Sequence, residues 1–378
     1  MANRADMLIF VEDPGAANYV APLPAALADR GWHTVVLAVG IANNYLLERG
    51  VSTQMVYPSA TANQILNAIQ PRVLLVGTAE NPDTLGLALV DEGRSAGITS
   101  VGVIDAAMNA EYRFRGRSGA ALTYAPDWLL VPDKWTKETY VALGFPAKQV
   151  IVCGHPHYDF VHETAIRLGK EDQKDLRQRL LPLGVPDGQK VVMFGTEGSV
   201  RVKSQPPQCL AEYALTGRGT SIGRTEIVLE EFLSAIKLVE SRPYLMLRLH
   251  PKDTRDDYKT YLDEFDFISS GGSPLELIYA ADLVVGLTSM LLLEAALLGK
   301  PTLSIVPRRG EMDFLPTIRM GITPCVTTRE QLSSALAGLL QDRPQIVHAC
   351  LDLNKVIVPG TLQKNIEFIE GLLLNRSG

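Results

Sequence analysis

Short apolar runs alternate with longer amphipathic segments along most of the chain. The apolar runs have the length and composition of buried strands, and the segments between them have helical periodicity. Strands that alternate with helices form parallel sheets, so the pattern predicts an α/β protein. In the first half the expected strands are Met7–Val11, Thr34–Ala38, Val73–Val76, Ser100–Ile104, Trp128–Val131 and Val150–Cys153, and the expected helices are Asn18–Arg30, Ala42–Arg49, Thr61–Ala68, Pro82–Ala96 and Lys134–Leu143.

A charged stretch from His162 to Leu181 interrupts this alternation and ends in the proline- and glycine-containing LPLGVPDGQK, which suits an interdomain connection. The same pattern then starts again and continues to a final amphipathic segment at Leu362–Leu373. In the second half the expected strands are Val191–Phe194, Tyr244–Leu249, Leu283–Val285, Thr302–Ile305 and Pro324–Val326, and the expected helices are Thr225–Val239, Pro274–Ala280, Ser289–Leu298 and Arg329–Leu340.

The chain has 378 residues, of which 46% are hydrophobic, so it exceeds one ordinary core and has apolar surface for two. We therefore expect two doubly wound, Rossmann-like domains that face each other across a cleft, where ligands of such sheets bind. The expected boundaries are 1–160 for the first domain, 161–187 for a linker, 188–358 for the second domain and 359–378 for a C-terminal helix that crosses back to the first.

The charge and the cysteines exclude several classes of protein. With 36 basic and 42 acidic residues the net charge is -6, so the chain as a whole does not attract nucleic acid. The four cysteines form no C-x-x-C pair, and the apolar runs are too short for a signal peptide or a membrane helix. We expect a cytoplasmic protein without a transmembrane segment, and a homodimer is possible. His155 and His157 have no third ligand nearby and the chain has no D-x-D, so we expect no metal.

In the first half, two loops that follow strands carry candidate chemistry. The first is VEDPGAAN, residues 11–18, which runs into a helix. Its carboxylates can activate a hydroxyl group, and its small residues let a ligand approach the backbone. A tight turn with an aspartate that caps the helix is an equal alternative. The candidates here are Asp13 as a base, with Glu12, Gly15 and Asn18 as acceptor contacts.

The second loop is VIDAAMNAEYRFRGR, residues 103–117. Asp105 stands at the end of a strand, where its carboxylate would point into the cleft, and we interpret it as a second candidate base. Arg113, among alternating arginines and aromatic residues, is a candidate contact for an anionic acceptor. Solvated arginines are the more common outcome on such a loop, and capping of the next turn is the alternative for the aspartate.

The second half has a glycine-containing loop, MFGTEGSVRVKSQ, after its first strand. Such a loop can wrap a ligand, and basic residues that follow it can hold phosphate. The sequence is not a P-loop, and an ordinary glycine turn with solvated basic residues is at least as common. The candidate donor-binding residues are Gly195, Thr196, Glu197, Gly198, Arg201 and Lys203.

Two later strands of this half also end in polar residues. LRLHPKD places His250, Pro251 and Lys252 at a strand end, where the histidine can donate to a phosphate oxygen or protonate a departing phosphate. In LVVGLTSMLLLE, Thr288 and Ser289 begin a helix, whose free amides favour an anion, and Glu294 follows inside it. A structural histidine and an ordinary N-cap are the alternatives.

The segments around these residues resemble a known family. AADLVVGLTSMLLLEAALLGKPTLSI resembles the donor-binding half of GT-B glycosyltransferases and of the related non-hydrolysing UDP-N-acetylglucosamine 2-epimerases, and APDWLLVPDKWTKETYVALGFPAKQVIVCGHPHYD resembles the segment before their interdomain linker. LRLHP with the later Thr-Ser is similar to motifs of bacterial sialyltransferases, polysialyltransferases and glycerophosphotransferases, which hold CMP or CDP.

By this resemblance His250, Thr288 and Ser289 contact the nucleotide phosphates and Glu294 reaches the ribose. The chain departs from the family in two places. Gly286-Leu287-Thr288-Ser289 replaces the epimerase Asp-Ser-Gly-Gly, and the acidic motifs of the epimerase first domain have no counterpart. Asp91-Glu92-Gly93 has the residues of a sialyltransferase motif. We do not assign that motif here, because we expect these residues late in a helix and away from the cleft.

These observations predict a metal-independent, inverting GT-B-like glycosyltransferase that moves a sugar from a nucleotide-activated donor to a hydroxyl acceptor, of the kind used in polysaccharide synthesis. His250 would stabilise the departing phosphate, and Asp13 or Asp105 would deprotonate the acceptor. The nucleotide sugar is a substrate, and no cofactor is expected. Two alternatives stay open: an epimerase or hydrolase of nucleotide sugars, and a noncatalytic protein that binds them.

Overall fold

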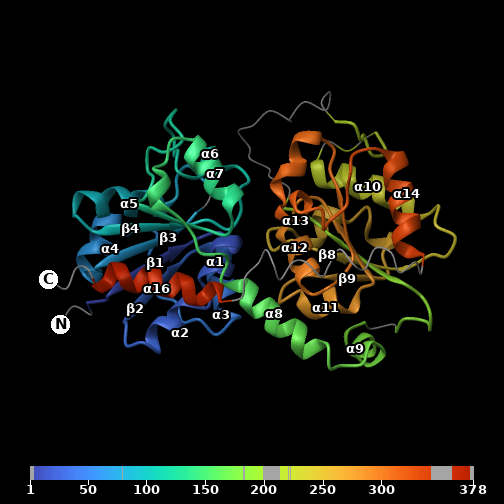
Figure 1. The fold of residues 1–378 in the computed structure, drawn as a ribbon, viewed down its shortest axis with the longest axis horizontal. Coiled ribbons are helices and arrows are strands. Elements are labelled where there is room, and N and C mark those ends of the chain that lie inside the picture. The colour runs from blue at the N-terminus through green and yellow to red at the C-terminus, as the bar shows by residue number, and fades with distance from the viewer. Residues whose placement is uncertain are drawn as a thin grey trace. The chain divides into compact units, whose positions relative to one another are not determined.

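The computed structural model describes residues 4–78, 80–181, 184–198, 213–219, 221, 223–341 and 360–374 (Figure 1). The chain forms two compact units, one made of Met1–Phe160 with Ile357–Gly378 and the other of Val161–Val356. Each contains one six-stranded, fully parallel sheet. The prediction of an α/β fold with two Rossmann-like domains is therefore confirmed.

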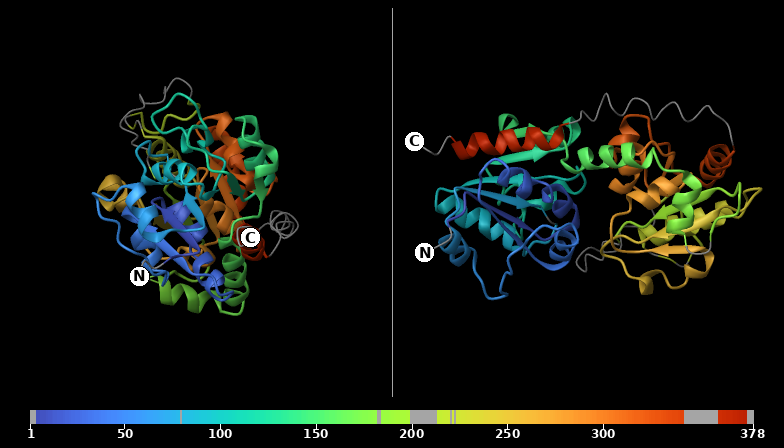
Figure 2. Two further views of the ribbon diagram at one scale, coloured as in Figure 1. Left: turned by 90° about the vertical axis from the view of Figure 1, so that its left-hand side faces the viewer. Right: turned by 90° about the horizontal axis from the view of Figure 1, so that it is seen from below.

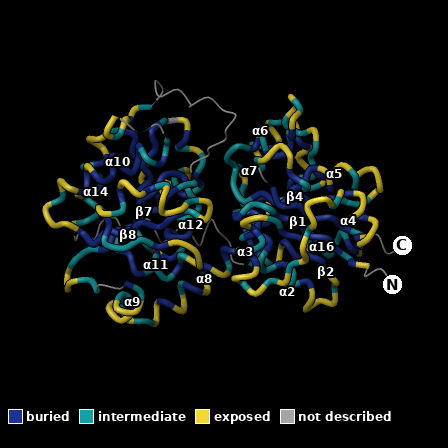
Figure 3. The backbone as a smooth tube through the Cα atoms, turned by 180° about the vertical axis from the view of Figure 1, so that it is seen from behind, coloured by how far each residue is buried: buried dark blue, intermediate teal, exposed yellow. Residues whose placement is uncertain are grey.

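The first sheet has the order β2-β1-β3-β4-β5-β6. The central strands are buried on both faces, which explains why their sequences are almost continuously apolar rather than alternating (Figure 3). The strands are β1 (Met7–Val11), β2 (Thr34–Ala38), β3 (Val73–Gly77), β4 (Thr99–Val103), β5 (Trp128–Val131) and β6 (Val150–Val152).

Helices cover both faces of this sheet (Figure 2). Side chains that alternate along β1 pack against α1, α2, α3 and α16 on one face and against α4 and α5 on the other. The helices are α1 (Pro14–Val20), α2 (Leu23–Ala28), α3 (Gly40–Leu47), α4 (Ala62–Ile69), α5 (Leu85–Ser95), α6 (Ala110–Arg113), α7 (Lys134–Ala142), α16 (Thr361–Leu374) and the start of α8 (His157–Leu168), with a 3₁₀ turn at Ala147–Gln149.

The expected helix Asn18–Arg30 is two helices. α1 begins earlier, at Pro14, because Asp13 caps it and accepts a hydrogen bond from the Gly15 amide at 3.1 Å. It cannot continue through Pro22, which has no N–H to donate, and α2 starts after that residue.

The C-terminal helix α16 packs on the first unit and completes its core (Figure 1, in red). Ile366, Ile369 and Leu373 are buried there among side chains of β1, α1 and α2. Asp159 accepts hydrogen bonds from the amides of Gly360 and Leu362 at 2.9 and 2.8 Å, so it holds the beginning of the helix. The helix predicted at Leu362–Leu373 thus forms, one residue longer at each end.

The segment GHPHYD is part of this docking surface. His155 is 4% exposed and lies between the rings of Tyr19 and Tyr158, and its carbonyl oxygen accepts from the Thr361 hydroxyl at 2.9 Å. Burial, with a smaller contribution from His157, lowers the pKa of His155 well below its ordinary value. The neutral ring packs as a structural group in this surface.

The second sheet has the order β12-β11-β10-β7-β8-β9. Its strands are β7 (Val191–Gly195), β8 (Tyr244–Arg248), β9 (Phe267–Ser269), β10 (Leu283–Gly286), β11 (Thr302–Ile305) and β12 (Cys325–Val326). The prediction missed β9, a three-residue edge strand. The helices are α9 (Gln173–Leu180), α10 (Arg224–Ile236), α11 (Leu275–Ala280), α12 (Met290–Leu297), α13 (Pro316–Arg319) and α14 (Arg329–Leu340), with 3₁₀ turns at Arg255–Tyr258, Leu262–Glu264 and Arg309–Phe314.

The stretch 161–187, expected as a linker, contains most of α8 and the whole of α9. α9 packs against α11, and Arg177 donates to the Ala280 carbonyl at 2.9 Å and to Asp282 at 2.8 Å. The Asp282 carboxylate also accepts from the Val191 amide at 2.7 Å, at the beginning of β7. The charged residues of this stretch therefore tie α9 to the amino ends of β7 and β10.

Candidate functional site

The carboxyl ends of β7, β8 and β10 lie at one edge of the second sheet, since neighbouring strands are parallel. The chain passes from β7 to β8 and β9 on one side, and later places β10 on the other side of β7. The order of connection therefore reverses between β7 and β10, and ligands of open α/β sheets bind at such a switch point. Three predicted residues each stand two positions after one of these strands: Glu197, His250 and Thr288.

Thr196 connects the ends of β7 and β8. Its amide donates to the Arg248 carbonyl at 2.9 Å, and its hydroxyl oxygen accepts from the His250 amide at 2.7 Å. The same hydroxyl donates its only proton to Asp253 at 2.7 Å, so it has no further hydrogen to donate. Thr196 is 3% exposed and fixes the backbone on both sides of His250 rather than facing a ligand.

The ring of His250 packs on Gly198, where an added Cβ would stand 2.8 Å from Nδ1. Nδ1 accepts from the Lys252 amide at 3.1 Å, so the neutral ring carries its proton on Nε2. Pro251 fixes the turn between these two residues. His250 is thereby held in the tautomer that presents an N–H donor.

Glu197 connects the ends of β7 and β10. Its Oε1 accepts from the Thr288 hydroxyl at 2.8 Å, and its Oε2 lies 3.5 Å from the Thr288 amide and accepts from Arg224 Nη1. Burial alone would raise the pKa of the Glu197 carboxyl. The Arg224 charge and these hydrogen bonds outweigh burial and hold that pKa below its ordinary value, so Glu197 is ionised.

Arg224 is the centre of a wider buried network. Besides Glu197, it donates to the Thr288 hydroxyl at 3.1 Å and to Glu311 at 3.0 Å. Glu311 is 2% exposed and accepts a further hydrogen bond from Arg308 at 2.7 Å. Burial would lower the pKa of the Arg224 guanidinium, and the two carboxylates raise it instead.

The prediction from sequence did not include Arg224, Arg308 or Glu311. One signal was present, because Arg224 begins α10, and a positive charge is unfavourable at the positive end of a helix dipole unless carboxylates compensate it. The partners come from loops 27 and 87 residues away, which no local pattern reveals.

Ser289 caps α12, and its hydroxyl oxygen accepts from the Leu291 amide at 3.2 Å. Gly195 allows α12 to approach β7, because an added Cβ would stand 2.8 Å from the Leu291 side chain. Glu294 lies in the first turns of α12 and is 8% exposed. Arg201 and Lys203 lie outside the described residues.

In the first unit, the order of connection reverses between β1 and β3. Asp13 follows β1 and caps α1, as the alternative reading predicted. Glu12 accepts from the Thr84 hydroxyl at 2.6 Å, at the beginning of α5. Asn18 lies in the second half of α1, and its side-chain oxygen is buried with no hydrogen-bond partner among the described residues.

Asp105 and Arg113 form an ion pair at the same edge. Arg113 Nη1 donates to Asp105 at 2.7 Å and to the Thr78 hydroxyl at 2.8 Å, and Nε donates to the Met108 carbonyl at 3.2 Å. Arg113 is only 6% exposed, so it is not solvated, although solvation is the more common outcome for an arginine on such a loop. Burial would lower the pKa of the Arg113 guanidinium, but the Asp105 carboxylate raises it above its ordinary value.

The other oxygen of Asp105 lies against Gly15. A Cβ added to Gly15 would stand 2.0 Å from Oδ2 of Asp105, so this position has no room for a side chain. Nearby, Asn109 donates to Glu80 at 2.8 Å and takes a left-handed backbone conformation with φ of 57°. Asn109 and Glu80 were not among the predicted residues. The structure thus places Asp13, Gly15, Asp105 and Arg113 together.

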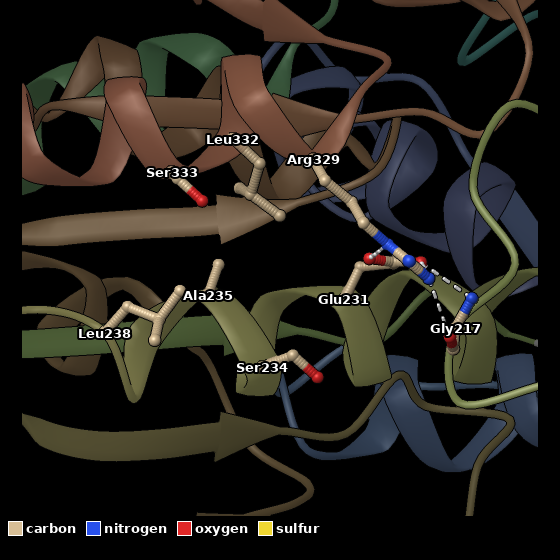
Figure 4. A pocket seen from close by; sticks show the side chains of 8 residues that line it. All are labelled: Gly217, Glu231, Ser234, Ala235, Leu238, Arg329, Leu332 and Ser333. Atoms are coloured by element: carbon tan, nitrogen blue, oxygen red, sulfur yellow. Dashed lines mark hydrogen bonds and ion pairs between the residues drawn. The ribbon is translucent and has the colours of Figure 1, made fainter.

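A surface hollow of about 340 Å³ lies elsewhere in the second unit, between α10 and α14 (Figure 4). Arg329 reaches across it and donates to Glu231 at 2.8 Å and to the Gly217 carbonyl at 3.0 Å. None of the predicted site residues lines this hollow. It is therefore separate from the candidate site.

Within the described ranges, no three histidine, cysteine, aspartate or glutamate residues cluster in a way that would hold a metal ion. No helix in the part of the chain that the structure describes is long and apolar enough to cross a membrane.

Comparison with known proteins gives a likeness in structure alone. No family model matches the sequence, and no curated protein matches it. Among solved structures, the UDP-GlcNAc 2-epimerase of Neisseria meningitidis bound to UDP-GlcNAc has a TM-score of 0.68 at 14% identity, with 97% of this chain and 99% of that chain covered.

Two further structures are similar over nearly their whole length. Anabaena Alr3699/HepE in complex with UDP has a TM-score of 0.62 at 11% identity and covers 97% of this chain and 99% of its own. The spinosyn rhamnosyltransferase SpnG complexed with thymidine diphosphate has a TM-score of 0.56 at 13% identity and covers 96% and 100%. The chain therefore shares its two-domain α/β fold with UDP-GlcNAc 2-epimerases and with a glycosyltransferase, as the sequence resemblance implied.

Proposed function

We propose that this protein is an enzyme that acts on a nucleotide-activated sugar and transfers the sugar to a hydroxyl acceptor, without a metal ion and with inversion. One observation carries the proposal. Residues after β7 join His250 to the Thr288–Ser289 turn at the edge of the second sheet where the order of connection reverses.

The second domain supplies the groups that a nucleotide phosphate needs. His250 presents an N–H at Nε2, and the Thr288–Ser289 turn begins α12, whose dipole favours negative charge. In this proposal these groups stabilise the charge that develops on the departing phosphate. Glu294, in the first turns of α12, contacts the ribose.

The first domain supplies a carboxylate base. Asp13 or Asp105 removes the proton of the acceptor hydroxyl, and direct attack of that oxygen on the anomeric carbon displaces the phosphate with inversion. Arg113 and Thr78 hold one oxygen of Asp105, which orients the carboxylate. Glu12, Gly15 and Asn18 contribute the remaining acceptor contacts.

An epimerase that acts on a nucleotide sugar is the second candidate. It is kept because the fold is more similar to an epimerase than to the glycosyltransferase. The Neisseria epimerase has a TM-score of 0.68 against 0.56 for the rhamnosyltransferase. An epimerase needs no acceptor, so it can be separated from a transferase by the products.

Incubation with UDP-, CMP-, GDP- and CDP-linked sugars separates the two. Release of nucleotide only when an acceptor is added supports transfer, and a changed sugar without acceptor supports epimerisation. If no donor is bound or consumed by the folded protein, the proposal is wrong.

His250→Ala tests the residue that carries the proposal. A hydrogen bond to a charged group contributes about 1.5–3 kcal/mol, so we expect nucleotide binding to weaken by at least tenfold. His33→Ala, at an exposed position in the first unit, is the matched control and should bind as the wild type does. Calorimetry with the nucleotide product measures both. Unchanged affinity of the His250 variant would remove this residue from the site.

A further inference from the structure

We propose that Glu197 sets the affinity of the second domain for the anionic group of its ligand, because its carboxylate occupies the donors that this group would use. The inference rests on the proposed function and adds a specificity-determining residue to the nucleotide site. Glu197 then acts as an internal anion that competes with phosphate.

The Glu197 carboxylate lies where the second sheet would bind a ligand. Glu197 follows β7 and reaches the turn after β10, so it spans the switch point of the second sheet. That place is where sheets of this kind bind their ligands. In this conformation the contacts across it are made by a side chain of the protein itself.

The groups that donate to Glu197 are of the kind that bind phosphate. Glu197 contacts the hydroxyl and the amide of Thr288 and the guanidinium of Arg224. A hydroxyl, an amide next to a helix N-terminus and an arginine are the groups that bind phosphate oxygens in proteins. The carboxylate therefore has the partners that a phosphate would have.

The charges around Glu197 balance without a ligand. Two carboxylates, Glu197 and Glu311, face two guanidinium groups, Arg224 and Arg308, so the network is neutral. Side chains in it are mostly buried, with 12% of Glu197 and 3% of Glu311 exposed. A phosphate that enters here meets the negative charge of Glu197 at short range in a poorly solvated place, which is unfavourable until the carboxylate moves or is removed.

The carboxylates of Glu197 and Glu311 differ in their partners. Both bind Arg224, but only Glu197 also binds Thr288. Glu311 retains Arg308 as a second partner and is almost fully buried. Glu197 is thus the carboxylate whose loss frees donors, and Glu311 keeps Arg224 in place.

A purely structural role predicts the opposite result. If Glu197 only held Thr288 and Arg224 in position, its loss would disorder the donors and weaken anion binding. If it competes with the ligand, its loss strengthens binding. The sign of the change therefore decides between the two roles.

The experiment measures binding of inorganic diphosphate, UDP and CMP to the full chain by calorimetry. Glu197→Gln keeps the shape and removes the charge, and we expect dissociation constants about tenfold lower than for the wild type, the effect of one charge-assisted hydrogen bond. Glu197→Asp keeps the charge and should not tighten binding. Should the Gln variant not fold, Glu197→Ser, which is also uncharged, carries the same expectation.

Glu240→Gln is the matched control for net charge. It makes the same charge change at an exposed position after α10, near the amino end of β8. If this variant tightens binding as much as Glu197→Gln, the effect is one of net charge and the inference is wrong. Equal or weaker binding by Glu197→Gln also overturns it.

Failure of the proposed function gives a different result. If neither the wild type nor any Glu197 variant binds a nucleotide, the second domain is not a nucleotide site and both proposals fall. If the wild type binds nucleotide and His250→Ala weakens binding, the nucleotide site of the proposed function stands whatever the Glu197 variants do.

Discussion

Substitution of Gly15 by alanine tests the arrangement around Asp105 in the first domain. The new Cβ would stand 2.0 Å from Oδ2 of Asp105, about 1 Å closer than real contacts allow, so the carboxylate must move. Its other oxygen is 2.7 Å from Arg113, and the movement lengthens this buried, charged hydrogen bond. Overpacking of this kind costs about 1–3 kcal/mol.

The preference of helices for alanine over glycine partly offsets this loss of stability. Gly15 lies inside α1, where alanine is favoured over glycine by about 0.5–1 kcal/mol. We therefore expect Gly15→Ala to lower the free energy of unfolding by about 1–2 kcal/mol in the wild-type background. In an Asp105→Ala background the carboxylate that the new Cβ would meet is absent. There Gly15→Ala should leave the free energy of unfolding unchanged or raise it slightly.

Urea unfolding followed by tryptophan fluorescence measures this cycle for the first domain alone, because all three tryptophans, Trp32, Trp128 and Trp135, lie in it. Gly119→Ala, at an exposed position with nothing within 4 Å of the added Cβ, is the control and should leave stability unchanged. If Gly15→Ala has the same effect with and without the Asp105 carboxylate, the two residues are not in contact and the reasoning is wrong.

Two further predictions concern the attachment of α16. Asp159→Ala removes the acceptor of the Gly360 and Leu362 amides, so hydrogen exchange in α16 should become faster and stability should fall by about 0.5–2 kcal/mol, whereas unchanged exchange would mean that this cap is not needed. Because the pKa of His155 is depressed in the folded state, the unfolded chain takes up a proton near pH 6.5 that the folded chain does not. Between pH 7.5 and 5.5 the free energy of unfolding of the wild type should therefore fall, by at most about 1.4 kcal/mol, and that of His155→Gln should fall less, as measured by urea unfolding at both pH values.

Most of the fold could be predicted because the central strands of both sheets are buried on both faces. Such strands are continuous apolar runs, and β1, β2, β5 and β11 begin and end at the predicted residues. The errors fall where a local signal is weak or is overridden. β9 has only three residues, and Pro22 divides a helix whose apolar periodicity continues across it.

The places of the candidate residues at the ends of strands could be predicted, but their contacts could not. Residues that follow parallel strands meet at one edge, which is how His250 and Thr288 were identified. Whether an arginine is solvated or buried depends on partners distant in sequence, and so the roles of Arg113 and Arg224 became visible only in the folded chain.

The division of the first unit between the two ends of the chain affects how the protein is made. α16 supplies Ile366, Ile369 and Leu373 to a core whose other members precede residue 160. A ribosome therefore releases the entire second unit before the helix that covers this apolar surface has been synthesised. Until then the nascent first unit exposes a hydrophobic face, so its final closure is a late event, and a fragment ending at Phe160 should aggregate unless α16 is supplied as a separate peptide.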